Sequence, residues 1–509
     1  MNLKKILVLA LAAVMVMSLS FMLGEEVQAQ DDELTVAQGA TRTTMDPQGE
    51  NDQPSAQVRA HIYDTLIHQT PDLELEPGLA VDWEQVDDVT WEFELREGVY
   101  FHNGEEFTAD DVKFTYERLI DPDMASDSAF LLDMLSDIEV VDDYTIRLEL
   151  EEPFTPLLSH LSHTSTSILN ETAVEEAGED YGITTSIGTG PYEFAEWLSG
   201  DYITLERNDN YWGEEANIEN LTFRTVEEST VRAIEVETGG VDIAFDVPPV
   251  DVERLDEDPG VEIIQSETLS TTYIGFNADR EPFDDVRVRQ AINYAVDTDP
   301  IVDQVYEGQA SRATGPISEL VWGAHPDLEP YEHDPDRAQE LLEEAGYEDG
   351  FSATIYTNDE SQRLQVSELV QDNLSDLNID ISVDVLEWGD YLERTGEGEH
   401  DMFVLGWVTV TGDADYGLYS LFHSSQYGHP GNRTFWSDPD VDDYLDDGRL
   451  LVDEDERETA YIEAQEIIRD EAPWIFLVNE DDVHGLQDNV QNFEPHPAGH
   501  HDLSQVTLD

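Results

Sequence analysis

The alternation of strand patterns and helix patterns is the feature that most restricts the fold of this chain. The segment "TWEFELREGVYF" (Thr90–Phe101) alternates polar and apolar residues and is rich in β-formers, which predicts a strand. In the next segment, "TADDVKFTYERLI", Thr108 can cap a helix, acidic residues follow it, and Val112, Tyr116 and Leu119 share one helical face. A strand is therefore followed directly by a helix.

The same alternation continues through the rest of the chain. The segments "TIRLELEEPF", "DISVDVLEW" and "DMFVLGWVTV" predict strands, and "DVRVRQAINYAVD", "DPDRAQELLEEAGY" and "SQRLQVSELVQDNLSDLNI" predict helices. Gly346 lies where the second of these helices should end. The pattern predicts an α/β architecture with helices covering sheets, and residues 30–509 are enough for two or three domains.

The N-terminus has the organisation of a secretory signal peptide. The basic "MNLKK" precedes the apolar run "ILVLALAAVMVMSLSFMLG", and Val27 and Ala29 are small residues at the exit. A membrane anchor is the alternative, because the run is near the minimum spanning length. The exit site and the polar tail after it favour cleavage at residue 29. The chain has no cysteine that could carry a lipid, so we expect a secreted, periplasmic protein.

The net charge indicates the solvent in which the protein works. There are 23 Lys and Arg against 117 Asp and Glu, a formal net charge of −94. Such a surface repels itself in dilute buffer, whereas at about 1 M salt the Debye length falls to about 3 Å and the repulsion is screened. We therefore expect exposure to high salt. An anionic partner such as nucleic acid is disfavoured.

The residues offer little for catalysis. The absence of cysteine excludes disulfides, thiolate chemistry and Cys-type zinc sites. No nucleophile elbow, zincin, P-loop or dinucleotide motif is present. Asp413 and Asp415 could form an acid pair, but among 117 acids such spacing arises often by chance. The sequence predicts no enzyme, no catalytic residue and no cofactor.

Histidines are the candidates for a metal site. Imidazole is a common metal ligand, and the candidates are His160, His163, His423, His429, His496, His500 and His501. Their spacing matches no established ligand set. We predict no metal site, and the sequence leaves open whether the histidines of the tail bind one.

Aromatic residues gather around the segment "GWVTVTGDADYGLYSLFHSS", which starts at Gly406. They are Trp388, Trp407, Tyr416, Phe435 and Trp436. Ligand pockets are typically lined by aromatic side chains with a few polar groups, although core packing is the alternative for each. Trp407 ends an apolar strand and begins a Thr- and Gly-rich loop, and strand ends commonly present ligand groups.

Six segments occur in a characteristic order along the chain: "TTMDP", "TWEFELREGVYFHNGEEFTADDVKFTYERL", "IGTGPYEF", "ERNDNYWG", "FNADREPFDDVRVRQAINYAVD" and "AQELLEEAGY". This ordered series resembles the family 5 extracellular solute-binding proteins of peptide and nickel ABC importers. In dipeptide and oligopeptide members, a carboxylate three residues after the Gly-Trp tryptophan anchors the ligand's amino group. Val410 stands there in this chain. The loop is instead similar to the glutathione-binding branch.

The resemblance implies a class II, two-lobed periplasmic binding protein fold with a ligand cleft between the lobes. The expected divisions are a signal peptide (1–29), lobe I (30–275) with an extra subdomain (about 70–190), lobe II (276–478) and a return to lobe I (479–509). The lobes would close over a small ligand by a hinge, and the closed monomer would dock on a membrane permease.

The resemblance also implies a site made by two loops. Arg42, Thr43 and Thr44 would offer a cation and hydroxyl groups from one lobe. The other loop would contribute Trp407, Thr409, Thr411, Gly412, Asp413 and Asp415. Glutathione or a similar small peptide is the expected ligand. A general dipeptide or oligopeptide binder and a nickel-complex binder are the alternatives, and neither the affinity nor the permease follows from the sequence.

Overall fold

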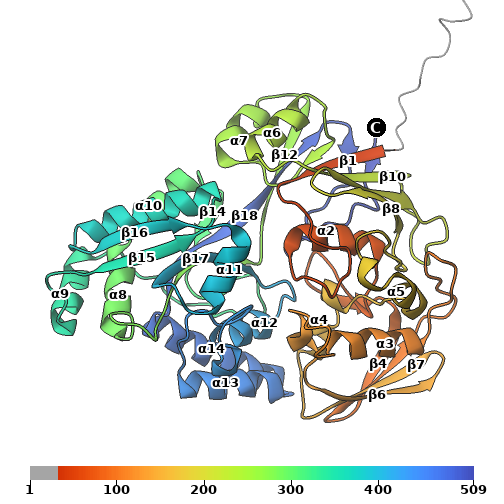
Figure 1. Ribbon diagram of the computed structural model, residues 1–509, viewed down its shortest axis with the longest axis horizontal. Helices are drawn as coiled ribbons and strands as arrows, with labels where there is room; N and C mark the ends of the chain where they lie inside the picture. The colour runs from red at the N-terminus through yellow and green to blue at the C-terminus, as the bar shows by residue number, and fades with distance from the viewer. Residues whose placement is uncertain (1–32) are drawn as a thin grey trace, which may run out of the picture.

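A computed structural model describes residues 33–509, and the predicted signal peptide lies outside these residues. The chain forms two lobes, and the long strand β18 (Trp474–Gln487) runs from one into the other (Figure 1). Its first half pairs with β13 (Ser270–Phe276) and β14 (Ala310–Arg312) of lobe II. Its second half pairs with β11 (Ile243–Ala244) and β12 (Val261–Glu267) of lobe I. One sheet therefore continues through both lobes.

The lobe I part of this sheet has the order β18-β11-β1-β10-β9-β8. The remaining strands are β1 (Glu33–Gln38), β8 (Tyr192–Leu198), β9 (Tyr202–Arg207) and β10 (Asn220–Thr225). β1 pairs in parallel with both β10 and β11, whereas β8, β9 and β10 are antiparallel neighbours. Mixed pairing of this kind brings the first strand of the chain beside segments some two hundred residues away.

The lobe II part has the order β16-β15-β17-β13-β18. Its further strands are β15 (Ser352–Thr357), β16 (Asp380–Val385) and β17 (Met402–Val408). β13 pairs along its whole length with β17, from Ser270 opposite Val408 to Phe276 opposite Met402. The strand β13 thus lies within lobe II, and the exact division of the chain at residues 275 and 478 stays a prediction.

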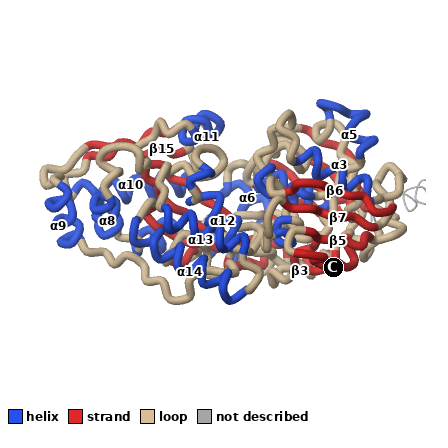
Figure 2. The backbone as a smooth tube through the Cα atoms, turned by 90° about the horizontal axis from the view of Figure 1, so that it is seen from below, coloured by secondary structure: helices blue, strands red, loops and turns tan. Residues whose placement is uncertain are grey.

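A separate sheet with the order β4-β5-β7-β6 forms the extra subdomain at the far end of lobe I, where Figure 2 shows its strands side by side. Its strands are β4 (Ala80–Asp87), β5 (Thr90–Leu95), β6 (Leu135–Asp142) and β7 (Thr145–Leu150). The predicted helix is α3 (Ala109–Leu119), and the Thr108 N–H donates to the Asp111 carboxylate at 2.9 Å in a capping box.

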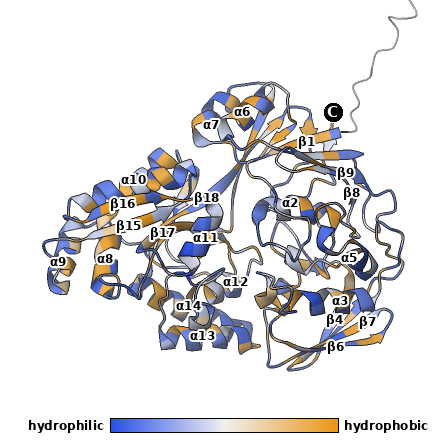
Figure 3. Cartoon of the chain, viewed as in Figure 1, coloured by the Kyte–Doolittle hydropathy of each residue, from blue (hydrophilic) through white to orange (hydrophobic). Residues whose placement is uncertain are grey.

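Helices cover both lobes. Lobe I contains α2 (Gln53–Ile62), α4 (Leu157–His160), α5 (Glu171–Ala177), α6 (Ser229–Glu237) and α7 (Pro249–Asp256). Lobe II contains α8 (Val286–Ala295), α9 (Pro335–Ala345), α10 (Ser361–Ser375), α11 (Trp388–Gly396), α12 (Ala414–Phe422), α13 (Pro439–Leu450) and α14 (Glu454–Glu471). Two further short antiparallel pairs are β2 (Ile67–Gln69) with β3 (Leu75–Pro77) and β19 (Val490–Gln491) with β20 (Thr507–Leu508). In Figure 3 both the strands and the covering helices carry a mixture of hydrophobic and hydrophilic residues.

The predicted elements are correct in type and too long at their ends. β5 stops at Leu95, β16 at Val385 and β17 at Val408. Trp388 does not end a strand but begins α11, because the Glu387 carboxylate caps that helix. Gly346 follows α9 with φ +87°, as the sequence predicts. Over residues 33–509, the helices are too short or too polar to span a bilayer.

Candidate ligand site between the lobes

The loop after β17 and the start of α12 contact lobe I directly. The Gln69 side-chain amide donates to the Thr411 carbonyl oxygen at 2.7 Å. The Asn51 side chain donates to the Tyr416 hydroxyl oxygen at 3.1 Å. A second contact joins the Thr155 hydroxyl to the carbonyl of Leu451, just after α13, at 2.6 Å. The lobes are therefore closed on one another at this junction.

Gly412 allows the closest part of this approach. It has φ +69°, a left-handed conformation that favours glycine. A Cβ atom there would lie 3.1 Å from the Gln69 amide nitrogen and 3.6 Å from Leu73 of lobe I. The Gly412 carbonyl also accepts the Trp322 N–H at 2.9 Å. Gly412, which the resemblance places in the ligand loop, therefore allows the backbone to approach lobe I closely.

Asp413 begins α12 and has a cationic partner within lobe II. Its carboxylate accepts the Asp415 N–H at 2.9 Å, which caps the helix, and lies 2.7 Å from an Arg457 guanidinium nitrogen. Burial alone would lower the pKa of Arg457, but the Asp413 charge raises it above its ordinary value. Both groups are almost completely buried. The arrangement fixes the loop to α14.

Asp415 connects the two lobes. Its carboxylate lies 3.0 Å from His160 Nε2 of lobe I and 3.0 Å from Arg449 Nε of α13. The Arg449 contact is an ion pair without hydrogen-bond alignment. Burial would raise the pKa of Asp415, but the Arg449 charge and the His160 hydrogen bond outweigh it and hold that pKa at about 2. Asp415 is thus an anion held by two lobes.

His160 has an oxygen acceptor at each ring nitrogen. Nδ1 is 2.9 Å from the Leu131 carbonyl oxygen, and Nε2 is 3.0 Å from the Asp415 carboxylate. A neutral imidazole carries one N–H, so both hydrogen bonds together require the doubly protonated ring. The geometry therefore fits an imidazolium–carboxylate pair that is formed only when the lobes meet.

Arg42, Thr43 and Thr44 lie in lobe I and bond within it. Arg42 is 2% exposed and donates to the Gln38 amide oxygen and to the Thr225 hydroxyl. Burial lowers the pKa of Arg42 to about 10, against the opposing charge of Asp52. Thr43 donates to Asp52, and the Thr44 hydroxyl accepts the Asp46 N–H. Among the hydrogen bonds and ion pairs of residues 33–509, none links these three residues to the loop at 407–415.

Part of the predicted aromatic group does meet at the junction. The Trp407 and Tyr416 rings are 5.3 Å apart, and Tyr416 lies 5.4 Å from His163 and 5.7 Å from Phe130 of lobe I. The Trp407 indole N–H is buried without a hydrogen-bond partner. By contrast, Trp436 belongs to the core and Trp388 is 43% exposed.

Arg433 is a residue that the sequence reasoning missed. It is buried, and no carboxylate lies within 4.0 Å of it among the described residues. One guanidinium nitrogen contacts His429 Nδ1 at 2.6 Å, another donates to the Pro430 carbonyl, and Nε has no partner. Burial lowers the pKa of Arg433, and Asp127 of lobe I is the carboxylate that opposes this. A signal exists in the sequence, because residues 416–437 contain no acidic residue in a chain with 117 of them.

Comparisons with known proteins assign the family. The model of "Bacterial extracellular solute-binding proteins, family 5 Middle" matches residues 74–429. The protein is 32% identical to the glutathione-binding protein GsiB of Shigella flexneri over 471 residues, 91% of each chain. GsiB of Escherichia coli K12 gives the same values. The chain therefore belongs to the family 5 solute-binding proteins, which are transport proteins.

Solved structures agree with this assignment. The Helicobacter pylori periplasmic binding protein DppA in complex with the peptide STSA has a TM-score of 0.86 at 31% identity, covering 95% of this chain and 100% of its own. The dipeptide-binding protein of Pseudoalteromonas sp. SM9913 in complex with Met-Leu has a TM-score of 0.86 at 26% identity, covering 94% and 100%. These structures confirm the predicted two-lobed α/β fold. The protein is of the type that serves as the substrate-binding component of an ABC importer.

Proposed function

We propose that this protein captures glutathione or a similar small peptide outside the cytoplasm and delivers it to the permease of an ABC importer. The similarity to GsiB supports this ligand class. Arg433 is the observation that carries the proposal, because a buried cation without a carboxylate partner is suited to a ligand carboxylate. As a monomer in the periplasm, the protein would present both closed lobes to the permease.

Arg433 and the aromatic cluster belong to one junction. The lobe I segment 127–130 reaches both, because Asp127 lies 3.5 Å from His429 and Phe130 lies 5.7 Å from the Tyr416 ring. Glutathione is a net anion at neutral pH, and a protein of −94 repels it at long range. A local cation that is shielded from the surface acids offsets this repulsion where the ligand binds.

Acidic residues at the same junction are available to bind the amino group of the ligand. Burial, Asp127 and Asp52 together raise the pKa of Glu50, so an ammonium group there would favour its ionised form. Asp413 and Asp415 already have arginine partners. We therefore assign them to holding the loop, with Trp407, Thr409, Thr411 and Gly412 as the wall beside the ligand. Arg42, Thr43 and Thr44 remain a proposed second anchor from lobe I.

Calorimetry in about 3 M salt, where surface charges are screened, tests the ligand class. Glutathione, dipeptides, a tetrapeptide and a nickel–histidine complex are titrated into the protein. We expect glutathione to bind. A preference for the peptides would instead make the protein a general peptide binder, and binding of the nickel complex alone would assign it to nickel uptake.

Matched variants test the site. Arg433→Gln should weaken glutathione binding by about 2–5 kcal/mol, at least tenfold, because it removes a buried charged contact. Trp407→Ala and Arg42→Ala should each weaken it without unfolding the protein. Arg337→Gln is the control, because Arg337 pairs with Glu340 on the surface of α9. If Arg433→Gln binds as tightly as the parent, the carboxylate anchor lies elsewhere.

A further inference from the structure

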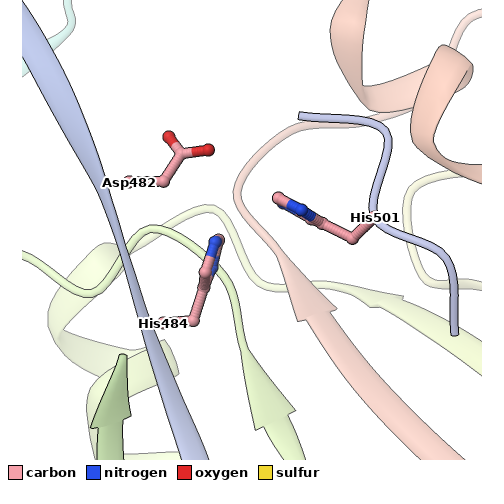
Figure 4. A group of neighbouring side chains, drawn as sticks. All are labelled: Asp482, His484 and His501. Atoms are coloured by element: carbon pink, nitrogen blue, oxygen red, sulfur yellow. The ribbon is translucent and has the colours of Figure 1, made fainter. Parts of the chain in front are cut away.

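A second cluster of titratable groups lies away from the junction, where β18 passes the C-terminal tail. It consists of Asp482 and His484 on β18 and His501 on the tail, and Figure 4 shows the three side chains converging. One potential ligand atom from each lies within 4.8 Å of the other two. His484 and His501 are buried, and Asp482 keeps some exposed surface.

Three of the four ring nitrogens in this cluster have no hydrogen-bond partner. Both ring nitrogens of His484 and Nε2 of His501 are buried and unpaired. Buried polar atoms in folded proteins are nearly always paired, so unpaired nitrogens on two neighbouring imidazoles suit a ligand that lies between them. The rings of Phe245 and Phe493 pack against both imidazoles at centroid distances between 4.9 and 5.6 Å, which shields the point from water.

The charges around the cluster favour a cation. Burial raises the pKa of Asp482 well above its ordinary value, and Asp246, Glu480 and Asp481 raise it further. Burial lowers the pKa of His484 to about 4, although Asp246 opposes this. Burial also lowers the pKa of His501, and neighbouring imidazoles lower it further. At neutral pH both imidazoles are therefore neutral, which is the form that binds metal.

We propose that Asp482, His484 and His501 bind one divalent transition-metal ion of the zinc type. Two imidazole nitrogens and a carboxylate oxygen match the ligands of Zn²⁺, whereas Ca²⁺ and Mg²⁺ prefer oxygen alone. In a tetrahedral zinc site the ligand atoms are roughly 3.3 Å apart. The separations, which reach at most 4.8 Å, must therefore shorten by up to about 1.5 Å when the ion binds.

Metal binding also requires a change at His501. Its Nδ1 accepts the His496 N–H at 3.0 Å, so the ring proton is on Nε2. Coordination through Nε2 moves this proton to Nδ1, and the His496 N–H must find another acceptor. Such a hydrogen bond contributes about 1 kcal/mol, far less than a zinc site supplies. The tail at residues 496–501 should therefore move when the ion binds.

The position gives the ion a mechanical role. β18 is the strand that passes through both lobes, and His501 belongs to the tail packed on lobe I. An ion bound by all three side chains would cross-link the tail to that strand. It would stabilise the folded protein without contacting the junction where the peptide is proposed to bind.

Cobalt titration of the chelator-treated full chain tests the proposal. We expect visible d–d absorption that saturates at one Co²⁺ per chain and is lost when Zn²⁺ is added. Zn²⁺ should raise the melting temperature, and Mg²⁺ and Ca²⁺ should not. Asp482→Asn and His484→Gln should each weaken Co²⁺ binding at least tenfold. His500→Ala, a tail neighbour outside the cluster, and His333→Ala, a surface histidine, are the controls and should bind as the parent does.

Anomalous diffraction from zinc-soaked crystals of the parent locates the ion independently of any variant. A peak between Asp482, His484 and His501 is expected. A parent chain without Co²⁺ absorption, a peak elsewhere, or equal binding by Asp482→Asn and His484→Gln would each overturn the proposal. Glutathione calorimetry on the same zinc-free and zinc-loaded samples keeps this result separate from the proposed transport function.

Discussion

Asp415 is a buried and Asp482 a partly buried carboxyl group in one very acidic chain, yet their surroundings shift the two pKa values in opposite directions. Asp415 has Arg449 and His160 at 3.0 Å, and its pKa falls to about 2. Asp482 has acids and unpaired imidazoles around it, and its pKa rises. Burial raises the pKa in both places, so the neighbouring charges decide the outcome. The first carboxylate is satisfied by the protein, whereas the second suits an added cation.

The largest expected effect follows from removing the satisfied carboxylate. Asp415→Asn leaves Arg449 and His160 buried without their anion, so the free energy of unfolding should fall by about 3–5 kcal/mol. Urea unfolding at pH 7 in about 3 M salt, followed by tryptophan fluorescence, measures this. Asp443→Asn on the exposed face of α13 is the control and should change stability by less than about 0.5 kcal/mol. If Asp415→Asn and Asp443→Asn lower the free energy of unfolding equally, the protein does not depend on the buried Asp415 carboxylate more than on a surface carboxylate.

Acid titration measures how much the ionised Asp415 carboxylate contributes to stability without removing the side chain. The unfolded chain has an Asp pKa of about 3.9, whereas the folded value for Asp415 is about 2. Because the folded pKa is depressed, the stabilisation is present above about pH 4 and is lost as the pH falls through 2, a change of about 2 kcal/mol. The stability gap between the parent and Asp415→Asn should narrow over this window. A stability difference between the parent and Asp415→Asn that does not change with pH would contradict the lowered pKa of Asp415.

Asp482→Asn should have a smaller effect of the opposite sign. The folded pKa of Asp482 is raised, so its favourable contribution is present below about pH 4 and is lost as the pH increases. With chelator at pH 8, the variant should therefore be more stable than the parent, and this difference in stability should close towards pH 4. Asp488→Asn, at an exposed position just after β18, is the control and should leave this pH dependence unchanged. Added Zn²⁺ should reverse the order by stabilising the parent alone.

Salt should change the repulsion between surface charges far more than it changes the stabilisation by the buried ion pairs. We expect the melting temperature of the parent to rise between roughly 0.1 and 3 M salt, because the charge of −94 is progressively screened. The stability difference between the parent and Asp415→Asn should change by less than about 0.5 kcal/mol over the same range, because buried pairs are screened little. A melting temperature that stays flat or falls with salt would contradict the expected screening of the surface charge. A stability difference between the parent and Asp415→Asn that depends strongly on salt would contradict the expectation that the buried pair is screened little.

The local structure and the family could both be predicted from the sequence. The strand before α3, the cap at Thr108 and the helix end at Gly346 depend on residues within a few positions of each other, so periodicity and capping reveal them. The ordered segments identified the solute-binding family, and the acid-free segment 416–437 carried a signal for Arg433. Of the aromatic residues grouped by the sequence, Trp407 and Tyr416 do lie together at the junction. Trp388 and Trp436 lie elsewhere.

Which charged groups form pairs could not be predicted from the sequence. Arg457 is 44 residues from Asp413, and His160 is 255 residues from Asp415. Arg42 binds Thr225 in its own lobe, and His501 reaches His484 only because the tail folds back along β18. Residue spacing encodes helices and strands because their contacts are local. Ion pairs and metal ligands depend on which strands and lobes become neighbours, and this is set by packing across the whole chain.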